Sequence, residues 1–298
     1  MHHLAPIILF TYKRLDTLKK TVAALQNNTL APQSDLIIFS DGAKKEEDNP
    51  VVEGVRNYLR KINGFKSVTI NESPINKGLA SSIIIGVSEV ITKYKKVIVL
   101  EDDLITSTNF LEYMNQALMF YQNNPNILSI CGYSPVIKGL NQTEVYFTQR
   151  SSSWGWACWE DRWMKIDWSV KSYSSFAKSY TAKRCFNKMG SDMSLMMKRQ
   201  MEGKINSWAI KFCFHQFQHQ LYSVHPAVSK IENIGFAEDN ATNTIQKFSR
   251  FKSNFYFSSS NIFDFKKEIK LEGNIISQFV KVNSIKNRII NKLINFIR

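Results

Sequence analysis

Three consecutive carboxylates follow an apolar run near the middle of the chain: Val97 to Leu100 precede Glu101, Asp102 and Asp103. Neighbouring carboxylates repel one another, so burying them is costly unless a cation lies among them. Mg²⁺ and Mn²⁺ take oxygen ligands, typically one or two carboxylates together with substrate phosphates. Because side chains alternate along a strand, we expect Glu101 and Asp103 on one side and Asp102 on the other. The triplet predicts a divalent-metal site; the alternative is a solvated loop in which Asp103 caps a helix.

Polar residues also follow the earlier apolar runs. Thr11 and Arg14 come just after the first run, and a guanidinium pairs well with phosphate. Asp41 ends the second run, where its carboxylate could accept the N3–H of uracil or a similar base, although Asp-Gly is also a common turn pair. Lys77 and Gly78 open a predicted helix, whose N-terminus attracts anions. Taken alone, Lys77 is more typical of an ordinary surface lysine.

A tryptophan-rich segment carries the second distinctive pattern. Trp154 and Trp156 flank a glycine that permits close backbone approach. Aromatic rings cover the C–H face of a sugar, while neighbouring carboxylates accept its hydroxyl protons. Trp159 and Trp163 stand four residues apart, which is more typical of the packing side of a core helix. We therefore expect Trp154 and Trp156 to contact a carbohydrate.

These residues need a scaffold, and the first half of the chain predicts one. Apolar runs without alternation, separated by amphipathic stretches, indicate an α/β fold with a mostly parallel sheet. Ligands bind beyond the carboxyl ends of such strands, which brings Thr11, Asp41 and the acidic triplet to one edge. We expect strands at 6–10, 36–40, 67–70 and 96–100, and helices at 15–26, 51–62, 78–93 and 109–122.

The composition and pattern of the sequence change after about residue 148. Six tryptophans fall between 154 and 208, in a region that reads as helices and loops. We expect one domain over 1–260, with a nucleotide-binding half at about 1–148 and an acceptor half at about 149–260. His215 and His219 have helical spacing, but no third ligand is evident nearby and the surrounding phenylalanines favour ordinary packing.

The composition limits the class of protein. Of 298 residues, 44% are hydrophobic and 12% aromatic, which suits a folded chain with a large core. The net charge of +14 predicts an anionic partner: nucleic acid, an anionic membrane or a phosphorylated substrate. The four cysteines form no C-x-x-C pair, and no apolar segment is long enough for a signal peptide or a membrane span. We expect reduced thiols and a cytoplasmic location.

The C-terminal tail, residues 261–298, forms a separate segment. Between Phe279 and Arg298 it carries five basic residues and no acidic one, and its apolar residues cover about half of a helical wheel. This pattern predicts a basic amphipathic helix lying on an anionic membrane, which would place the chain on the inner face of the cytoplasmic membrane. A helix docked on its own domain or on a dimer partner is the alternative.

The order of these motifs resembles the GT-A class of nucleotide-sugar glycosyltransferases. Within that class the chain is similar to N-acetylglucosaminyltransferase I and its bacterial relatives in surface-polysaccharide synthesis. The matching segments are P-I-I-L-F-T-Y-K-R (6–14), F-S-D-G (39–42), N-K-G-L (76–79), V-L-E-D-D-L (99–104), S-W-G-W-A-C-W-E-D-R-W (153–163), S-W-A-I (207–210) and N-I-G-F-A-E-D-N-A-T (233–242).

The resemblance implies a role for each residue of the nucleotide half. Asp103 would ligate Mn²⁺ or Mg²⁺, Asp102 would contact the ribose, and Glu101 would hold the donor sugar. Asp41 and Arg14 would hold the nucleotide. It also implies an inverting transfer from a nucleotide-diphosphate sugar, with UDP-N-acetylglucosamine favoured. The acceptor would be a glycan or lipid-linked oligosaccharide in capsule, lipopolysaccharide or related synthesis.

The chain departs from this pattern at the general base. The family places an acid just before the tryptophan that matches Trp208, but Asn206 and Ser207 stand there. The remaining candidates for the base are the acidic residues Asp239, Glu238 and Asp161, and the sequence leaves the choice open.

Two other functions compete with glycosyl transfer. A sugar nucleotidylyltransferase also combines such a sheet with an acidic metal site, but the segment from Phe10 to Leu15 lacks the glycine-rich loop that it needs. A non-enzymatic protein that binds membranes or nucleic acid would explain the charge of +14, yet it leaves the acidic triplet and the tryptophans without a role. We therefore expect no nucleic-acid partner.

Overall fold

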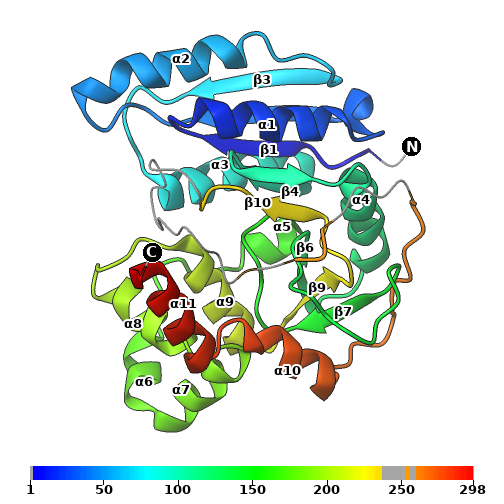
Figure 1. Ribbon diagram of the computed structural model, residues 1–298, viewed down its shortest axis with the longest axis vertical. Helices are drawn as coiled ribbons and strands as arrows, with labels where there is room; N and C mark the ends of the chain where they lie inside the picture. Colours follow the sequence, from blue (N-terminus) through cyan, green and yellow to red (C-terminus); the bar gives the residue numbers. More distant parts are fainter. Residues whose placement is uncertain (1–2, 237–250, 252, 256–259, 298) are drawn as a thin grey trace.

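A mixed eight-stranded sheet forms the centre of the molecule in the computed structural model, which describes residues 3–236, 251, 253–255 and 260–297 (Figure 1). The strands in sheet order are β3 (Ser67–Glu72), β2 (Asp35–Ser40), β1 (Ile7–Thr11), β4 (Lys96–Glu101), β8 (Trp156–Trp159), β6 (Ile127–Cys131), β9 (Tyr222–Pro226) and β7 (Val145–Thr148).

The first four strands of this order are parallel, as the sequence predicted. β1 is buried along its whole length and β4 along its interior, because helices cover both faces of the sheet here. The predicted strand and helix ranges are confirmed to within three residues at each end. The helices of this half are α1 (Leu15–Gln26), α2 (Asn49–Leu59), α3 (Leu79–Tyr94) and α4 (Phe110–Tyr121), with short 3₁₀ turns η1 (Ala31–Gln33) and η2 (Glu46–Asp48).

The second half was predicted as helices and loops, and this prediction is wrong in part. Strands β8 and β9 lie in this half and extend the same sheet, and β8 runs antiparallel between β4 and β6. Strands β6 and β7, at the end of the first half, were not predicted. The tryptophan pair expected on a core helix is divided, because Trp159 ends β8 and Trp163 ends the short helix that follows it. A helical layer does form beyond the sheet: α5 (Glu160–Trp163), α6 (Tyr173–Lys178), α7 (Tyr180–Phe186), η3 (Asn187–Met189), α8 (Met193–Met201) and α9 (Trp208–Gln218).

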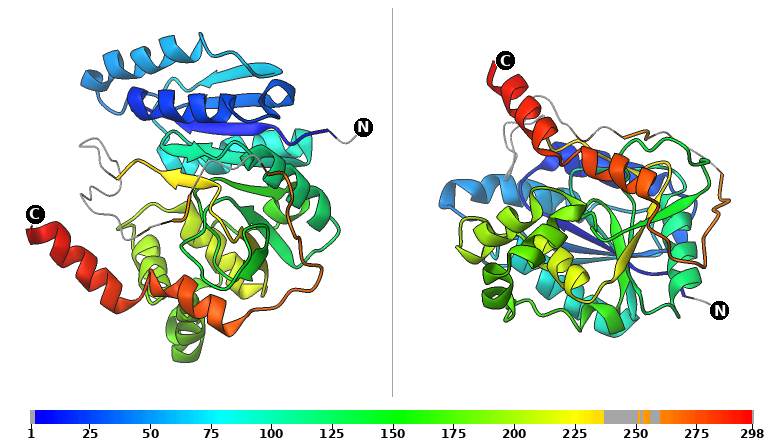
Figure 2. Two further views of the ribbon diagram at one scale, coloured as in Figure 1. Left: turned by 45° about the vertical axis from the view of Figure 1, so that its right-hand side comes forward. Right: turned by 90° about the horizontal axis from the view of Figure 1, so that it is seen from below.

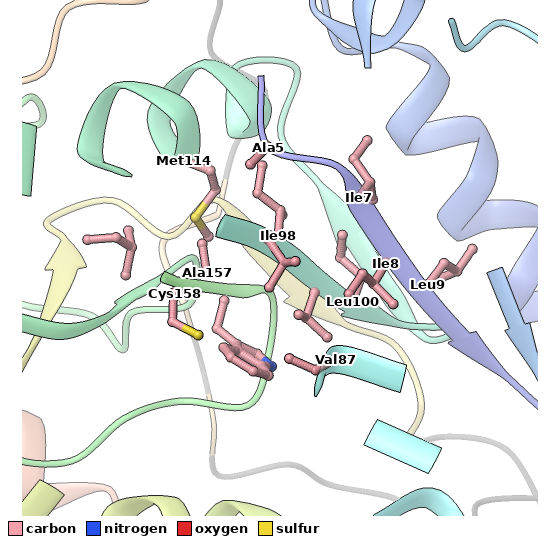
Figure 3. Close-up of a cluster of buried hydrophobic side chains, with 14 of the residues drawn as sticks. Ala5, Ile7, Ile8, Leu9, Val87, Ile98, Leu100, Met114, Ala157 and Cys158 are labelled. Carbon is pink, nitrogen blue, oxygen red and sulfur yellow. The ribbon is translucent and has the colours of Figure 1, made fainter. Parts of the chain in front are cut away.

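The core lies where the two halves of the sheet meet (Figure 3). Ile8 of β1, Ile98 of β4 and Ala157 of β8 are fully buried in it. Met114 from α4 and Val87 from α3 close it. Burial of apolar surface from both halves in one cluster fixes the position of the strand ends that carry the polar residues.

A two-stranded antiparallel ribbon lies over the carboxyl edge of β4. It pairs β5 (Leu104–Thr106), which directly follows the acidic triplet, with β10 (Ile231–Asn233). The sequence did not predict this ribbon. It brings a segment from the second half of the chain against Asp103, since the Ile234 amide donates to the Asp103 carbonyl over 2.9 Å.

The tail forms two helices rather than the single one predicted: α10 (Gly273–Lys281) and α11 (Ile285–Ile297), with a break at 282–284 (Figure 2). α10 packs on the body, where Ile275 and Phe279 are buried with Ile137 and Tyr146. Across the described residues, no helix is both long and apolar enough to span a membrane.

Candidate active site

A cleft of about 1040 Å³ opens beyond the carboxyl ends of β1, β2 and β4. It runs from the loops after these strands to α8, the start of α9 and the junction between α10 and α11. The site residues predicted from sequence that line it are Thr11, Arg14, Asp41, Glu101, Asp102, Asp103 and Trp154. The edge rule for parallel sheets therefore located the cleft correctly.

Arg14 joins the last two carboxylates of the triplet. Its Nη2 lies 2.6 Å from Asp102 Oδ1 and 3.0 Å from Asp103 Oδ2. The sequence had placed Asp102 on the opposite side from Asp103, and this prediction is wrong. Strand β4 ends at Glu101 and a turn follows, so strand alternation does not apply to the next two residues.

The other oxygen of Asp102 holds the loop after β1. Its Oδ2 accepts hydrogen bonds from Thr11 Oγ1 at 2.9 Å and from the Tyr12 amide at 3.3 Å. Both oxygens of this buried carboxylate are thus engaged by residues of the β1 loop. Thr11 and Arg14, predicted as nucleotide contacts, also position Asp102.

The cluster holds more negative than positive charge. Burial, reinforced by repulsion from Asp103 and Asp102, raises the pKa of Glu101 to about 8. Burial also raises the pKa of Asp103, although the nearby Arg14 opposes that shift. Burial lowers the pKa of Arg14, but the combined attraction of Asp102 and Asp103 is larger and raises it overall. The guanidinium therefore stays charged. One guanidinium offsets one of three potential charges, and the cluster therefore favours an additional cation.

The carboxylates of this cluster could serve as ligands of a divalent metal. Among the described residues, no group of three or more His, Cys, Asp and Glu side chains is arranged to hold an ion by itself. Mg²⁺ and Mn²⁺ do not require such a cage, because one or two carboxylates suffice when substrate phosphates supply the other oxygens. Asp103 lines the cleft and its carboxylate can serve in this way. The residues fit a metal that binds together with a diphosphate.

Asp41 organises the loop before α3. Its Oδ1 accepts from the amides of Gly42 at 3.0 Å and Lys77 at 2.8 Å, and its Oδ2 accepts from the Gly78 amide at 2.9 Å. The turn chemistry that the Asp-Gly pair indicated is therefore present at this position. The carboxylate still lines the cleft, as do Asn76 and Gly78, whereas Lys77 is exposed and is not among the lining residues.

The two predicted sugar-binding tryptophans have different environments. Trp154 lines the cleft and meets Tyr133 edge-on, with ring centroids 4.6 Å apart. Trp156 is only 1% exposed and stacks on Trp163 in the core, so its predicted contact with a donor sugar is wrong. Gly155 between them has φ +59°, and a Cβ there would crowd Ile231. The glycine therefore permits packing against the β10 strand, and its left-handed backbone separates Trp154 from β8, which begins at Trp156.

Of the three candidate bases, the structure describes Asp161. Asp161 follows β8 at the end where Trp159 pairs with Lys96, the opposite end of β4 from Glu101, and its exposed carboxylate pairs with Arg162. The structure does not bring Asp161 to the cleft. Glu238 and Asp239 lie outside the described residues.

Asn206 and Ser207 do line the cleft at the position where a base was sought. The Ser207 hydroxyl accepts from the Ile210 amide at 3.4 Å and so caps α9. The acids of the described cleft are therefore those at the strand ends.

Sequence reasoning missed the role of Gly235. A Cβ at this position would overlap the carboxylate of Asp103 and lie 2.9 Å from the Arg14 guanidinium. The Gly235 amide donates to Asn233 Oδ1 at 2.9 Å, which closes the turn that follows β10. The segment N-I-G-F carried the signal, but nothing local in the sequence showed which carboxylate the glycine would face.

The chain also matches a known family. Residues 7–176 match the family described as glycosyl transferase family 2. The chain belongs to this family. The match covers more than half of the 298 residues and includes the strands and loops that carry Thr11, Arg14, Asp41 and the acidic triplet.

Solved structures resemble parts of this family 2 chain. The mannosyltransferase PcManGT from Pyrobaculum calidifontis, in complex with GDP-Man and Mn²⁺, is 11% identical, with a TM-score of 0.39 over 53% of this chain and 44% of that one. S. aureus TarS is 12% identical, with a TM-score of 0.33 over 47% of this chain and 24% of that one. The chain thus spans less than half the length of either. No curated protein matches it.

The family match and the sheet agree on the fold. The predicted GT-A architecture, a mostly parallel sheet flanked by helices with a helical C-terminus, is confirmed. The family 2 assignment supports glycosyl transfer over the nucleotidylyltransferase and non-enzymatic alternatives.

Proposed function

We propose that this family 2 glycosyltransferase moves a sugar from a nucleotide diphosphate to a hydroxyl of a glycan or lipid-linked acceptor. A UDP-sugar, with UDP-N-acetylglucosamine as first choice, is the proposed donor, and bacterial capsule, lipopolysaccharide or related surface-polysaccharide synthesis is the proposed pathway. The closer resemblance to N-acetylglucosaminyltransferase I is part of this proposal. The observation that carries it is the Arg14–Asp102–Asp103 cluster, which lies beside Glu101 at the mouth of a cleft in a family 2 fold.

The proposed donor site has one set of residues for the nucleotide and another for the sugar. Asp41 and Arg14 would hold the nucleotide, with Asp41 presented by the backbone of the 76–78 loop. Asp102 would fix the β1 loop through Thr11 and contact the ribose with its remaining acceptor capacity. Glu101 and the exposed part of Trp154, which both line the cleft, would contact the donor sugar.

The proposed reaction is a single displacement. The acceptor hydroxyl attacks the anomeric carbon, the bond to the diphosphate oxygen breaks, and the configuration inverts. Asp103 would hold Mn²⁺ or Mg²⁺, which when bound supplies positive charge for the leaving diphosphate. A carboxylate takes the hydroxyl proton. Glu238 and Asp239 are the proposed bases, since they follow Gly235 and Phe236 at the wall of the cleft.

A donor screen tests this proposal. Thermal shift and hydrolysis would be measured with UDP-, GDP-, CMP- and dTDP-sugars, each with Mn²⁺ and with EDTA. Stabilisation and slow hydrolysis of one nucleotide class, lost in EDTA, is the expected result. If no donor binds, or if binding is the same in EDTA, the metal-dependent donor site is wrong.

We also include in the proposal that the tail attaches the enzyme to an anionic membrane.

A further inference from the structure

The last helix, α11, exposes its apolar side to solvent. Three residues at successive helical turns of α11 are 52–62% exposed: Ile285, Ile289 and Leu293. Ile290, on the same side, is 41% exposed. Most residues on the opposite side are polar and less accessible: Asn291 is only 4% exposed, and the half-buried Ile294 is the apolar residue there. A helix that packs on its own domain for stability normally buries the apolar side instead.

Polar contacts hold α11 in this orientation. Arg288 Nη1 donates to Ser191 Oγ at 3.4 Å, and Ser191 Oγ donates to the Asn283 carbonyl at 2.8 Å. The side-chain Nδ2 of Asn287 donates to the Lys281 carbonyl at 2.8 Å, which ties the start of α11 to the end of α10. α10 itself is anchored by the burial of Phe279. α11 extends from the body of the molecule beyond α10 (Figure 2). These contacts leave Ile285, Ile289 and Leu293 exposed.

The exposed side is also basic. Lys286 and Lys292 lie on it together with the apolar residues, and the whole segment from 273 to 298 contains no Asp or Glu. An in-plane helix on an anionic bilayer combines these two features, because it buries its apolar stripe at the lipid boundary and places cations among the headgroups. A second copy of this chain suits the surface less well, because its own α11 would bring the same positive charge.

The helix begins at the end of the cleft. Phe279, Val282 and Asn283, from the junction of α10 and α11, line the cleft with Met193 and Met196 of α8. Phe279, Val282, Met193 and Met196 give this end of the cleft apolar side chains, next to the polar Asn283 and Arg199. An acceptor with a lipid part therefore meets the protein at the point where the outward-facing helix starts.

We propose that α11 docks in the plane of an anionic membrane through Ile285, Ile289 and Leu293, and thereby sets the α8 end of the cleft at the bilayer for a lipid-linked acceptor. The docking rests on α11 alone. The assignment of the acceptor rests on the proposed glycosyl transfer. The other tail helix, α10, packs on the body of the protein. The membrane-bound helix predicted from the sequence is therefore α11, and the alternative of a helix docked on its own domain describes α10.

The test uses the full chain and vesicles of phosphatidylcholine with or without about a third of phosphatidylglycerol. Wild type should sediment with the anionic vesicles at low salt and much less at high salt. The variant Ile285→Ser/Ile289→Ser/Leu293→Ser should lose on the order of 100-fold in vesicle affinity while keeping the wild-type Tm. The matched control replaces three apolar residues on other helices that are 48–76% exposed, Val51→Ser/Ile85→Ser/Tyr180→Ser, and should bind like wild type.

The outcomes separate the docking from the reaction. Unchanged vesicle binding by the α11 variant, or equal binding of wild type to neutral vesicles, overturns the proposal. A wild-type dimer that the α11 variant converts to a monomer in light scattering also overturns it, because a second copy then covers the face. Vesicle binding without any nucleotide-sugar hydrolysis keeps the docking and refutes the proposed function. Hydrolysis that the α11 variant retains in solution confirms that the helix acts outside the donor site.

Discussion

Gly235 lies directly against the carboxylate of Asp103, although the two residues are far apart in the chain. The ribbon between β5 and β10 brings them together, with the Ile234 amide held at the Asp103 carbonyl over 2.9 Å. No side chain larger than hydrogen fits at Gly235 without moving this carboxylate or Arg14. The position of the proposed metal ligand therefore depends on a glycine from the second half of the chain.

The first prediction concerns this glycine. Gly235→Ala should displace Asp103 and lower the rate of transfer by about 100-fold or more, since small displacements of a catalytic group are costly. The control is Gly54→Ala in α2, where an added Cβ meets nothing within 4 Å. It should keep full activity and gain about 0.5–1 kcal/mol in unfolding free energy. Activity and urea denaturation measure both, and an active Gly235→Ala enzyme would show that Asp103 tolerates movement.

The second prediction concerns Asp103 itself. Asp103→Asn should abolish metal-dependent binding of the nucleotide diphosphate and with it transfer. Its Tm should change little, because the amide fits the same space and Arg14 keeps its 2.6 Å contact with Asp102. Asp35→Asn, which affects a surface carboxylate paired with Lys66, serves as the control for removing one charge. Isothermal titration with Mn²⁺ and nucleotide gives the comparison, and wild-type binding by Asp103→Asn would remove Asp103 from the site.

The sequence predicted the parallel half of the fold because its signals are local. β1 and β4 are continuous apolar runs that are buried on both faces, and the polar residues after them had to meet at one edge. The strand β8 was missed because four residues carry too little periodicity, and the spacing of its tryptophans imitates a helix. Gly235 and the orientation of α11 depend on contacts between distant segments, which no local pattern contains.

The third prediction separates the two tryptophans. Trp156→Ala removes a core side chain that is 1% exposed, and it should cost about 3–5 kcal/mol of unfolding free energy. Trp154→Ala removes a half-buried wall of the cleft, so it should lower stability less and raise the KM for the donor sugar several-fold. Thermal denaturation and steady-state kinetics distinguish the two effects. A Trp156→Ala protein that keeps its stability but has a raised KM for the donor sugar would show that Trp156 contacts the sugar.

The fourth prediction concerns Arg14. Arg14→Gln leaves two buried carboxylates without their guanidinium, and breaking such a pair typically costs about 3–5 kcal/mol. Arg14 opposes the burial that raises the pKa of Asp103, so losing the cation raises this pKa further. The destabilisation should therefore be larger at pH 8 than at pH 5, where Asp103 takes up a proton. Arg60→Gln, at an exposed pair that solvent screens, should leave stability nearly unchanged at both pH values. A loss of stability at Arg14 that is independent of pH would refute the electrostatic account.

The fifth prediction concerns His215, which the sequence assigned to packing. The residue is 6% exposed, and its ring centroid lies 4.4 Å from that of His219. Burial, and then repulsion from His219, lower the pKa of His215 to about 4, while Asp167 opposes the shift. The unfolded chain binds the proton near pH 6.5, well before the folded protein does.

Stability from a neutral His215 is therefore complete above about pH 6.5 and is lost as the pH falls toward 4. At about 1.4 kcal/mol per pKa unit, the full loss is on the order of 3 kcal/mol. His215→Asn should be less stable than wild type at pH 7.5, yet it should lose less unfolding free energy between pH 7.5 and pH 5. His219→Asn removes only the second cause of the shift, so its acid-induced loss should lie between those of wild type and His215→Asn. Parallel acid-induced losses in wild type and His215→Asn would mean that His215 is protonated as readily in the folded state as in the unfolded chain.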